Sequence, residues 1–294
     1  MSKTREPLRL DVRKTYKLFI NGEFVRSESG RTDHAGSEVD RANIARASRK
    51  DLRDAAVAAR AAFPRWAAAS PLNRGQVLYR LAEMMDARRP ELVEGLRTGA
   101  NLDEPAALRE AATAVDRVLW YAGWCDKYVS VVSSRNPVAG PYFIYSTPEP
   151  MGIVGVIAPD EPPLLGLVCA VVPALVSGNA VIALASETDP RTAIVFAECV
   201  ATSDLPAGSV NILTGRRIEL APHLARHMDI NALLTYALDA PFAAELERLA
   251  ADNLKRTRTI GTLSSAEWFA DEAQDLAHVV AFTETKTIWH PAAI

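Results

Sequence analysis

The feature that most constrains the fold of this chain is a regular alternation of short apolar runs and helical segments between residues 152 and 251. The pattern predicts strands at 152–158, 180–184, 210–213 and 232–235, and helices at 163–176, 191–202, 220–226 and 241–251. The strand cores are continuous runs of Val, Ile, Leu and Ala, as expected where helices cover both faces of a parallel sheet. The sequence therefore predicts an α/β fold with a doubly wound, mostly parallel, Rossmann-like sheet.

The region before this alternation has a helical pattern. Ser48 followed by Asp51 predicts a helix start, because their side chains can accept hydrogen bonds from unpaired backbone N–H groups. Pro64 is expected to kink or end that helix, and Pro71 fits the first position of the next one. A third helix is predicted over 105–132. The sequence thus predicts helices from Ser48 to about Val132, before the sheet.

The composition excludes several classes of partner. A formal net charge of -3, with 23% charged residues, gives no electrostatic attraction to nucleic acid or anionic membranes. The basic start lacks the apolar stretch of a signal peptide, and the longest apolar run, 164–176, is too short to span a bilayer. The three cysteines show no CxxC spacing. We therefore expect a cytoplasmic protein with no nucleic-acid and no membrane partner.

A series of segments, in a fixed order, resembles a known family. The segments read LFINGEFVRSESGRT, YAGWCDKY, YFIYSTPEPMGIVGVIAP, PPLLGLVCAVVPALVSGNAVIALASETDP and SDLPAGSVNILTG. Together they resemble the aldehyde dehydrogenase superfamily over residues 16–256, most specifically over 149–215. The resemblance implies a nucleotide-binding α/β domain with N-terminal helices over 1–262. A bridging helix and a C-terminal oligomerisation strand would follow over 263–294.

The resemblance also shows which catalytic residues differ. The family uses a cysteine thiolate, an asparagine that holds the oxyanion, and a glutamate base. Here Glu161 stands where the asparagine belongs, and an ionised carboxylate can only accept hydrogen bonds. Ile260 falls in the place of the glutamate, and the 34 residues after it contain no cysteine. The upstream cysteines are expected to be buried and inert. We therefore predict no catalytic residue.

The family's cofactor site is retained only in part. Its remaining positions are Ile157, Pro159, Glu187 and Gly215. The family lysine corresponds to Leu184, a family glycine corresponds to Arg217, and the Phe-Thr-Gly-Ser turn reads Thr235-Tyr236-Ala237-Leu238. Glu187 is interpreted as an acid at a helix start rather than a ligand. We expect no cofactor, or NAD or NADP if any is bound.

Two further sets of residues leave alternatives open. Arg216 and Arg217 at a helix start could hold an anion, or be solvated charges. His223 and His227 lie four residues apart on a predicted helix and could face one metal, or be surface histidines. No metal site is predicted, because no Glu or Cys completes a recognisable set.

The C-terminal segment FTETKTIWHP resembles the closing strand of the family, which pairs with a sheet edge of the neighbouring subunit. The segment YFIYSTPEP resembles another strand of the same assembly element, and residues 264–282 would form the bridging helix. The partner would be a full-length aldehyde dehydrogenase or a second copy of the chain. It would bind through the strand Tyr142, Phe143, Ile144, Tyr145 and through the strand between Phe282 and Trp289. Alternatively, the tail folds back onto its own sheet.

These observations give one main functional hypothesis and two alternatives. The main hypothesis is a catalytically inactive pseudoenzyme that acts as an assembly or regulatory subunit of an active aldehyde dehydrogenase. The first alternative is a weak or split-site NAD(P)-dependent aldehyde oxidoreductase. The second is a free-standing binder of another small molecule.

Overall fold

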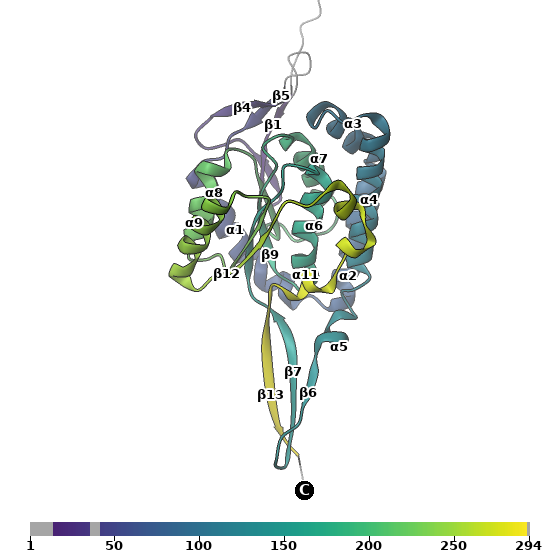
Figure 1. Ribbon diagram of the computed structural model, residues 1–294, viewed down its shortest axis with the longest axis vertical. Coiled ribbons are helices and arrows are strands. Elements are labelled where there is room, and N and C mark those ends of the chain that lie inside the picture. Colours follow the sequence, from purple (N-terminus) through teal and green to yellow (C-terminus); the bar gives the residue numbers. More distant parts are fainter. Residues whose placement is uncertain (1–13, 36–41, 293–294) are drawn as a thin grey trace, which may run out of the picture.

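The computed structural model describes residues 14–35 and 42–292. At its centre lies a seven-stranded sheet in the order β12-β11-β8-β9-β10-β2-β3 (Figure 1). The strands are β2 (Leu18–Ile20), β3 (Glu23–Val25), β8 (Ile153–Ile157), β9 (Ala180–Leu184), β10 (Val210–Leu213), β11 (Ala232–Tyr236) and β12 (Arg256–Ile260). The five strands from β12 to β10 are parallel, and β2 pairs with β10 in the antiparallel sense. The predicted doubly wound, mostly parallel α/β fold is confirmed.

The sheet separates two layers of helices. One layer holds α2 (Pro71–Ala87), α3 (Arg89–Gly99), α4 (Glu104–Ala122), α6 (Pro163–Val176) and α7 (Pro190–Ala201); the other holds α1 (Arg49–Ala68), α8 (Arg217–Arg226) and α9 (Ala240–Ala250). Successive strand residues face opposite layers, so Val154 and Val156 pack in one apolar cluster and Ile153 and Ile157 in the other. Burial on both faces explains the continuous apolar runs in the sequence.

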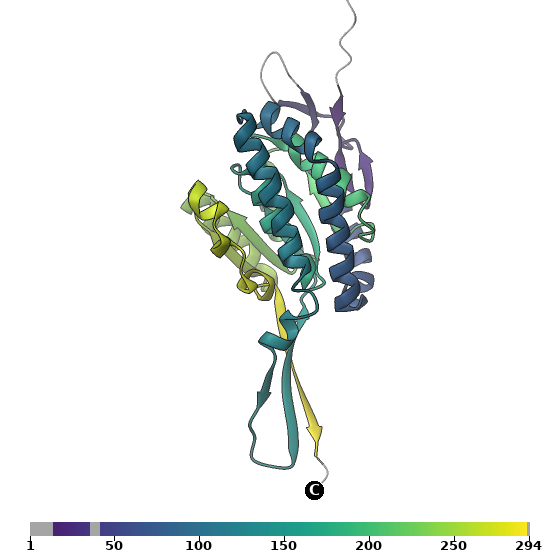
Figure 2. The same ribbon diagram turned by 90° about the vertical axis from the view of Figure 1, so that its right-hand side faces the viewer.

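Two small sheets flank this body. A three-stranded sheet near the start of the chain has the order β1-β5-β4, with β1 at Thr15–Tyr16, β4 at Thr32–Ala35 and β5 at Ala42–Ala45. The other, which we call the arm, has the order β13-β7-β6, with β6 at Ser134–Asn136, β7 at Tyr142–Pro150 and β13 at Thr283–Pro291. Both views show the arm as a narrow extension away from the body (Figures 1 and 2).

Some local predictions are wrong. α1 continues through Pro64 to Ala68, because its last turn is held by Trp66, whose buried indole Nε1–H donates to the Leu175 carbonyl at 3.0 Å. The helix predicted over 105–132 is two helices, α4 and α5 (Tyr128–Val132). They are separated by turns that follow Gly123 at the C-cap of α4. The strand expected over Tyr142–Tyr145 is longer, since β7 continues through Pro148 to Pro150.

The strand β7 includes both prolines because of its pairing. β6 pairs only with Ile144, Tyr145 and Ser146, so beyond Ser146 one side of β7 has no strand beside it among the described residues. A proline, which lacks an N–H group, is tolerated at such an edge.

The bridging segment is not one helix. It contains α10 (Ser265–Phe269), a 3-10 turn (Asp271–Ala273) and α11 (Leu276–Val280). Ser264 forms a capping box with Glu267, and Asp275 caps α11 through a 2.9 Å hydrogen bond from Ala277 N. Two separate helix starts therefore divide the segment. Within the residues that the structure describes, no helix is long and apolar enough to cross a membrane.

Candidate functional site

The candidate site is the crevice at the carboxyl ends of β8, β9 and β10. The chain runs from β8 to β9 and β10 on one side and returns to β11 and β12 on the other, so the direction of winding changes at β8. Ligands of open α/β sheets bind outside the carboxyl ends of the strands at such a point. The loops after these strands meet here, since Glu187 N donates to Asp160 Oδ1 at 2.8 Å.

An ion pair lies across this crevice. Arg217 Nη1 is 2.8 Å from Asp160 Oδ2, and Arg217 Nη2 is 2.8 Å from Asp160 Oδ1 and 2.7 Å from the Ala158 carbonyl oxygen. The Arg217 side chain is only 11% exposed. This bidentate geometry is the strong form of an arginine–carboxylate contact. Of the two arginines that could hold an anion, Arg217 is therefore already paired with Asp160, and Arg216, whose side chain is 55% exposed, has its Nε 3.8 Å from Asp33 Oδ2.

Glu187 occupies the start of α8. Its Oε1 accepts a hydrogen bond from the backbone N of Arg217 at 2.5 Å. The first N–H groups of a helix have no partner within the helix and favour a negative charge. Glu187, in the loop before α7, supplies that charge to α8. Its interpretation as an acid at a helix start therefore fits the geometry, but the helix is α8 and not α7, which follows it in the sequence.

The other three residues predicted for the cofactor site lie at the same edge. Ile157 is fully buried at the end of β8 and packs against the α1, α8 and α9 layer. Pro159 packs on Gly166, where an added Cβ would come within 2.3 Å of the Pro159 ring. Gly215 has a φ of +141°, which L side chains rarely adopt. A hollow of about 420 Å³, lined in part by Glu187 and Gly215, opens beside the crevice.

A second cavity, of about 290 Å³, lies at the start of α6. Glu161 lines it and is exposed, so the residue in the oxyanion position presents a carboxylate rather than an amide. Glu110 of α4 lines it too, and accepts hydrogen bonds from Leu164 N at 2.8 Å and Leu165 N at 3.1 Å. Burial raises the pKa of the Glu110 carboxyl to about 7, with smaller contributions from Asp189 and Glu161. The cavity therefore contains a carboxyl group that titrates near neutral pH.

Sequence reasoning missed Glu110. The signal was available, because Glu110 lies on the same helix face as Ala107, Ala111 and Ala114, all of which are buried. An acidic residue on the apolar face of a helix needs hydrogen-bond donors, and the free N–H groups of α6 supply them here.

Neither the three cysteines nor Ile260 offers an accessible group for the family's reaction. Cys125, Cys169 and Cys199 are buried as predicted, and burial raises the pKa of each thiol to about 12. Ile260 ends β12 and is partly buried. Tyr236, at the position of the cofactor-closing turn, is buried at the end of β11, and its ring centroid lies 5.5 Å from that of Trp268.

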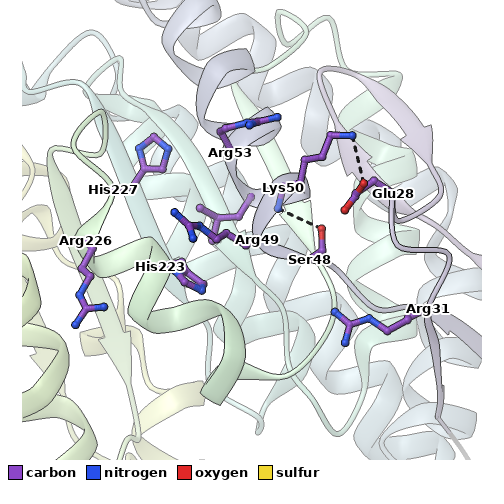
Figure 3. A pocket seen from close by; sticks show the side chains of 10 residues that line it. Glu28, Arg31, Ser48, Arg49, Lys50, Arg53, His223, Arg226 and His227 are labelled. Carbon is purple, nitrogen blue, oxygen red and sulfur yellow. Dashed lines mark hydrogen bonds and ion pairs between the residues drawn. The ribbon is translucent and has the colours of Figure 1, made fainter.

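The two histidines belong to a different place. His223 and His227 line a hollow between α1 and α8, away from the crevice (Figure 3). Among the residues that the structure describes, no group of three or more His, Cys, Asp or Glu side chains is arranged to hold a metal ion.

An open α/β sheet with helices on both faces and a crevice at the carboxyl ends of its strands defines a protein of the Rossmann-like class. The family model described as "Aldehyde dehydrogenase family" matches residues 26–289, so the chain belongs to the aldehyde dehydrogenase family.

Relatives and solved structures agree with this assignment. Cytosolic aldehyde dehydrogenase 1 of Elephantulus edwardii is 31% identical over 91% of this chain and 55% of that protein. Human cytosolic 10-formyltetrahydrofolate dehydrogenase is 31% identical over 76% of this chain and 25% of that protein. The NAD+ complex of a Bacillus cereus aldehyde dehydrogenase matches with a TM-score of 0.79 and 27% identity, over 84% of this chain and 51% of that one. The Thermus thermophilus HpcC structure matches with a TM-score of 0.79 and 30% identity, over 84% of this chain and 48% of that one. The chain therefore spans about half or less of the length of these relatives.

Proposed function

We propose that this protein is a catalytically inactive aldehyde dehydrogenase-like subunit, which assembles with and regulates an active, full-length aldehyde dehydrogenase. The observation that carries the proposal is the arm, which has free strand edges and exposed aromatic side chains. The altered chemistry of the crevice and of the cavity at the start of α6 supports the inactive state.

The arm offers a surface for another subunit. All nine residues of β13 pair with β7 of the same chain, so the tail folds back as in the alternative considered from the sequence, but onto the arm rather than the central sheet. The outer edge of β13 remains unpaired among the described residues. Tyr142, Phe143 and Trp289 are 46%, 42% and 60% exposed. Free strand edges with exposed aromatic residues favour β-augmentation by a second chain.

The crevice does not fit a dinucleotide. Arg217 and Asp160 pair across it, and Glu187 already caps the helix start that would receive a phosphate group. Leu184, where the family has a lysine, is buried at the end of β9. We propose that the chain binds neither NAD nor NADP there, and that Ile157, Pro159, Glu187 and Gly215 are the remains of the ancestral site.

The acyl chemistry of the family also lacks its residues. Glu161 would repel the negative charge that develops on an aldehyde oxygen, and Ile260 cannot activate a water molecule. The thiols have pKa values of about 12 and are buried, so they do not supply a nucleophile. The three free cysteines fit the reducing cytoplasm, where we place the protein.

Co-expression with a full-length aldehyde dehydrogenase of the same host tests the assembly function. We expect a hetero-oligomer on size-exclusion chromatography with light scattering, with a defined subunit ratio. Stopping the chain after Glu284, or combining Tyr142→Ser with Trp289→Ser, should release the partner, because both changes alter only the arm. The matched control is Leu72→Ser in α2, which removes an equally exposed apolar side chain, 63% exposed, from the body.

Two outcomes would contradict this function. Either the arm variants co-purify with the partner at the unchanged ratio, or the intact chain never binds it. The split-site alternative predicts that turnover of the complex falls when Glu161→Gln is introduced. In the proposed function that variant leaves turnover per partner subunit unchanged.

A further inference from the structure

A basic hollow of about 710 Å³ lies on the side of α8 that faces α1 (Figure 3). Its cationic side chains are Arg31, Arg49, Lys50, Arg53 and Arg226. Figure 3 shows Arg49 and His223 close together in the middle, with Arg31 and Lys50 on one side and His227 and Arg226 on the other. The crevice lies elsewhere, because Arg217 at the start of α8 points to Asp160 rather than to α1.

The charge of the basic hollow is not balanced from within. Five cationic side chains line the hollow together with one carboxylate, Glu28, whose Oε2 lies 3.2 Å from Lys50 Nζ; outside the lining, Arg53 Nη2 lies 3.5 Å from Asp54 Oδ1. Within residues 14–35 and 42–292, Arg49 and Arg226 have no ion pair or side-chain hydrogen bond. The chain as a whole has a net charge of -3, so this concentration of positive charge is local. The repulsion among these cations would be relieved by a bound anion.

Helix stability favours only one of these cations, Arg226, which lies in the last turn of α8, where the helix dipole favours positive charge. Arg49, Lys50 and Arg53 lie in the first five residues of α1, where the helix dipole disfavours positive charge. The acid of that turn, Asp51, does not neutralise them. Its carboxylate is buried and accepts hydrogen bonds from Ser27 Oγ at 2.8 Å, Glu28 N at 3.0 Å and Ser48 N at 2.7 Å. Arg49, Lys50 and Arg53 therefore do not stabilise the start of α1 through their charge.

The pKa of His223 responds to cations of the basic hollow, whereas other charges act on His227. Burial is the main cause that lowers the pKa of His223, and the positive charges of Arg49 and Arg226 lower it further. Burial lowers the pKa of His227, with Lys255 and Arg60 acting in the same direction and Asp229 opposing them. An anion in the basic hollow would favour the protonated form of both rings and gain two more donors.

We propose that the basic hollow is a binding site for a small anion that carries two or more phosphate groups, of the size of a nucleotide. Guanidinium groups bind phosphate oxygens in pairs, and the volume lies within the range of small-molecule pockets. The site is independent of the assembly function, because none of its residues belongs to the arm or the crevice.

Calorimetric titration of the intact chain with sodium tripolyphosphate and with magnesium-free ATP tests this site. We expect saturable binding of both at low salt, and tighter binding at pH 6 than at pH 8. Arg49→Gln combined with Arg226→Gln should weaken it about ten-fold or more, since each substitution removes a charge-assisted hydrogen bond. His223→Gln should reduce the pH effect. If the double variant does not fold, Arg49→Gln alone should weaken binding several-fold.

Two matched controls separate a site from general charge. Arg80→Gln with Arg97→Gln removes two exposed arginines from α2 and α3, and Arg216→Gln alters the mouth of the crevice. Both should leave affinity unchanged. The proposal is overturned if neither anion binds saturably, if a control weakens binding as much as the double variant, or if a duplex oligonucleotide binds and tripolyphosphate does not displace it.

Discussion

Arg217 and Asp160 join two loops that follow different strands, with both guanidinium Nη atoms 2.8 Å from carboxylate oxygens. Asp160 follows β8, and Arg217 begins α8 after β10. The same helix start donates its first N–H to Glu187. The crevice is thus bridged by contacts within the chain, on which the proposal that it binds no dinucleotide rests.

Arg217→Gly should open the crevice. We expect at least a ten-fold gain in NAD affinity over the wild-type chain, because the Arg217 side chain and its ion pair no longer compete with the pyrophosphate. The variant should also lose about 1–3 kcal/mol of stability, since Asp160 is left without its partner. Calorimetry and thermal melting measure the two effects. Low-micromolar binding of NAD to the wild-type chain would contradict the argument, and the control Arg216→Gly should not change affinity.

The isolated chain should not reduce NAD or NADP with any aldehyde. Glu161 and Ile260 replace groups that the family's reaction needs, so Glu161→Asn alone should not restore turnover. A panel of aliphatic and aromatic aldehydes, followed by absorbance of the reduced cofactor, checks this. Steady production above a heat-treated control for even one aldehyde would disprove it.

The three thiols should be inert in the folded protein. With pKa values of about 12, only about one thiol in 10⁴ is ionised at pH 8, and burial blocks access as well. Ellman's reagent should therefore label fewer than one thiol over minutes under native conditions, and all three in guanidinium chloride. Rapid labelling of the native chain would show that one thiol is accessible.

Glu110 should make stability depend on pH. Its pKa is raised from an ordinary value of 4.5 to about 7, so folding favours the protonated carboxyl. The stability that this proton contributes is complete below about pH 4.5 and is lost as the pH rises through about 7. We expect the free energy of unfolding to fall by about 1–3 kcal/mol between pH 5 and pH 8 from this group. Glu110→Gln keeps an acceptor for Leu164 N and Leu165 N but cannot titrate. Urea unfolding of the variant should show a smaller fall, and an identical fall would exclude Glu110 as the cause.

The central fold was predictable because its signals are local. Continuous apolar strands and their flanking helices place β8 to β11, α6 and α9 to within a few residues. β12 was not predicted, since RTRTI alternates between partly buried and exposed positions at the sheet edge. Pro64 and Pro148 lie inside their elements rather than at the ends, because distant contacts decide whether a proline ends an element. Those contacts are the Trp66 hydrogen bond to Leu175 and the short reach of β6.

The site was predictable in position but not in its contacts. The family resemblance placed Glu187 and Arg217 at one edge of the sheet, and the structure brings them together. That Arg217 would pair with Asp160 depends on how two loops meet, which no spacing in the sequence states. The basic hollow could not be predicted from the sequence either. Its arginines come from segments 177 residues apart, at Arg49 and Arg226.

The pairing of β7 with β13 has a consequence for the order in which the molecule is made. Pro150 pairs with Thr283, and Tyr142 pairs with Pro291, so the paired residues are separated by 133 to 149 positions in the sequence. During synthesis β7 leaves the ribosome long before its neighbour exists, and its edge must wait until the whole α/β body has followed. A nascent chain that has not yet reached β13 would therefore present no finished arm.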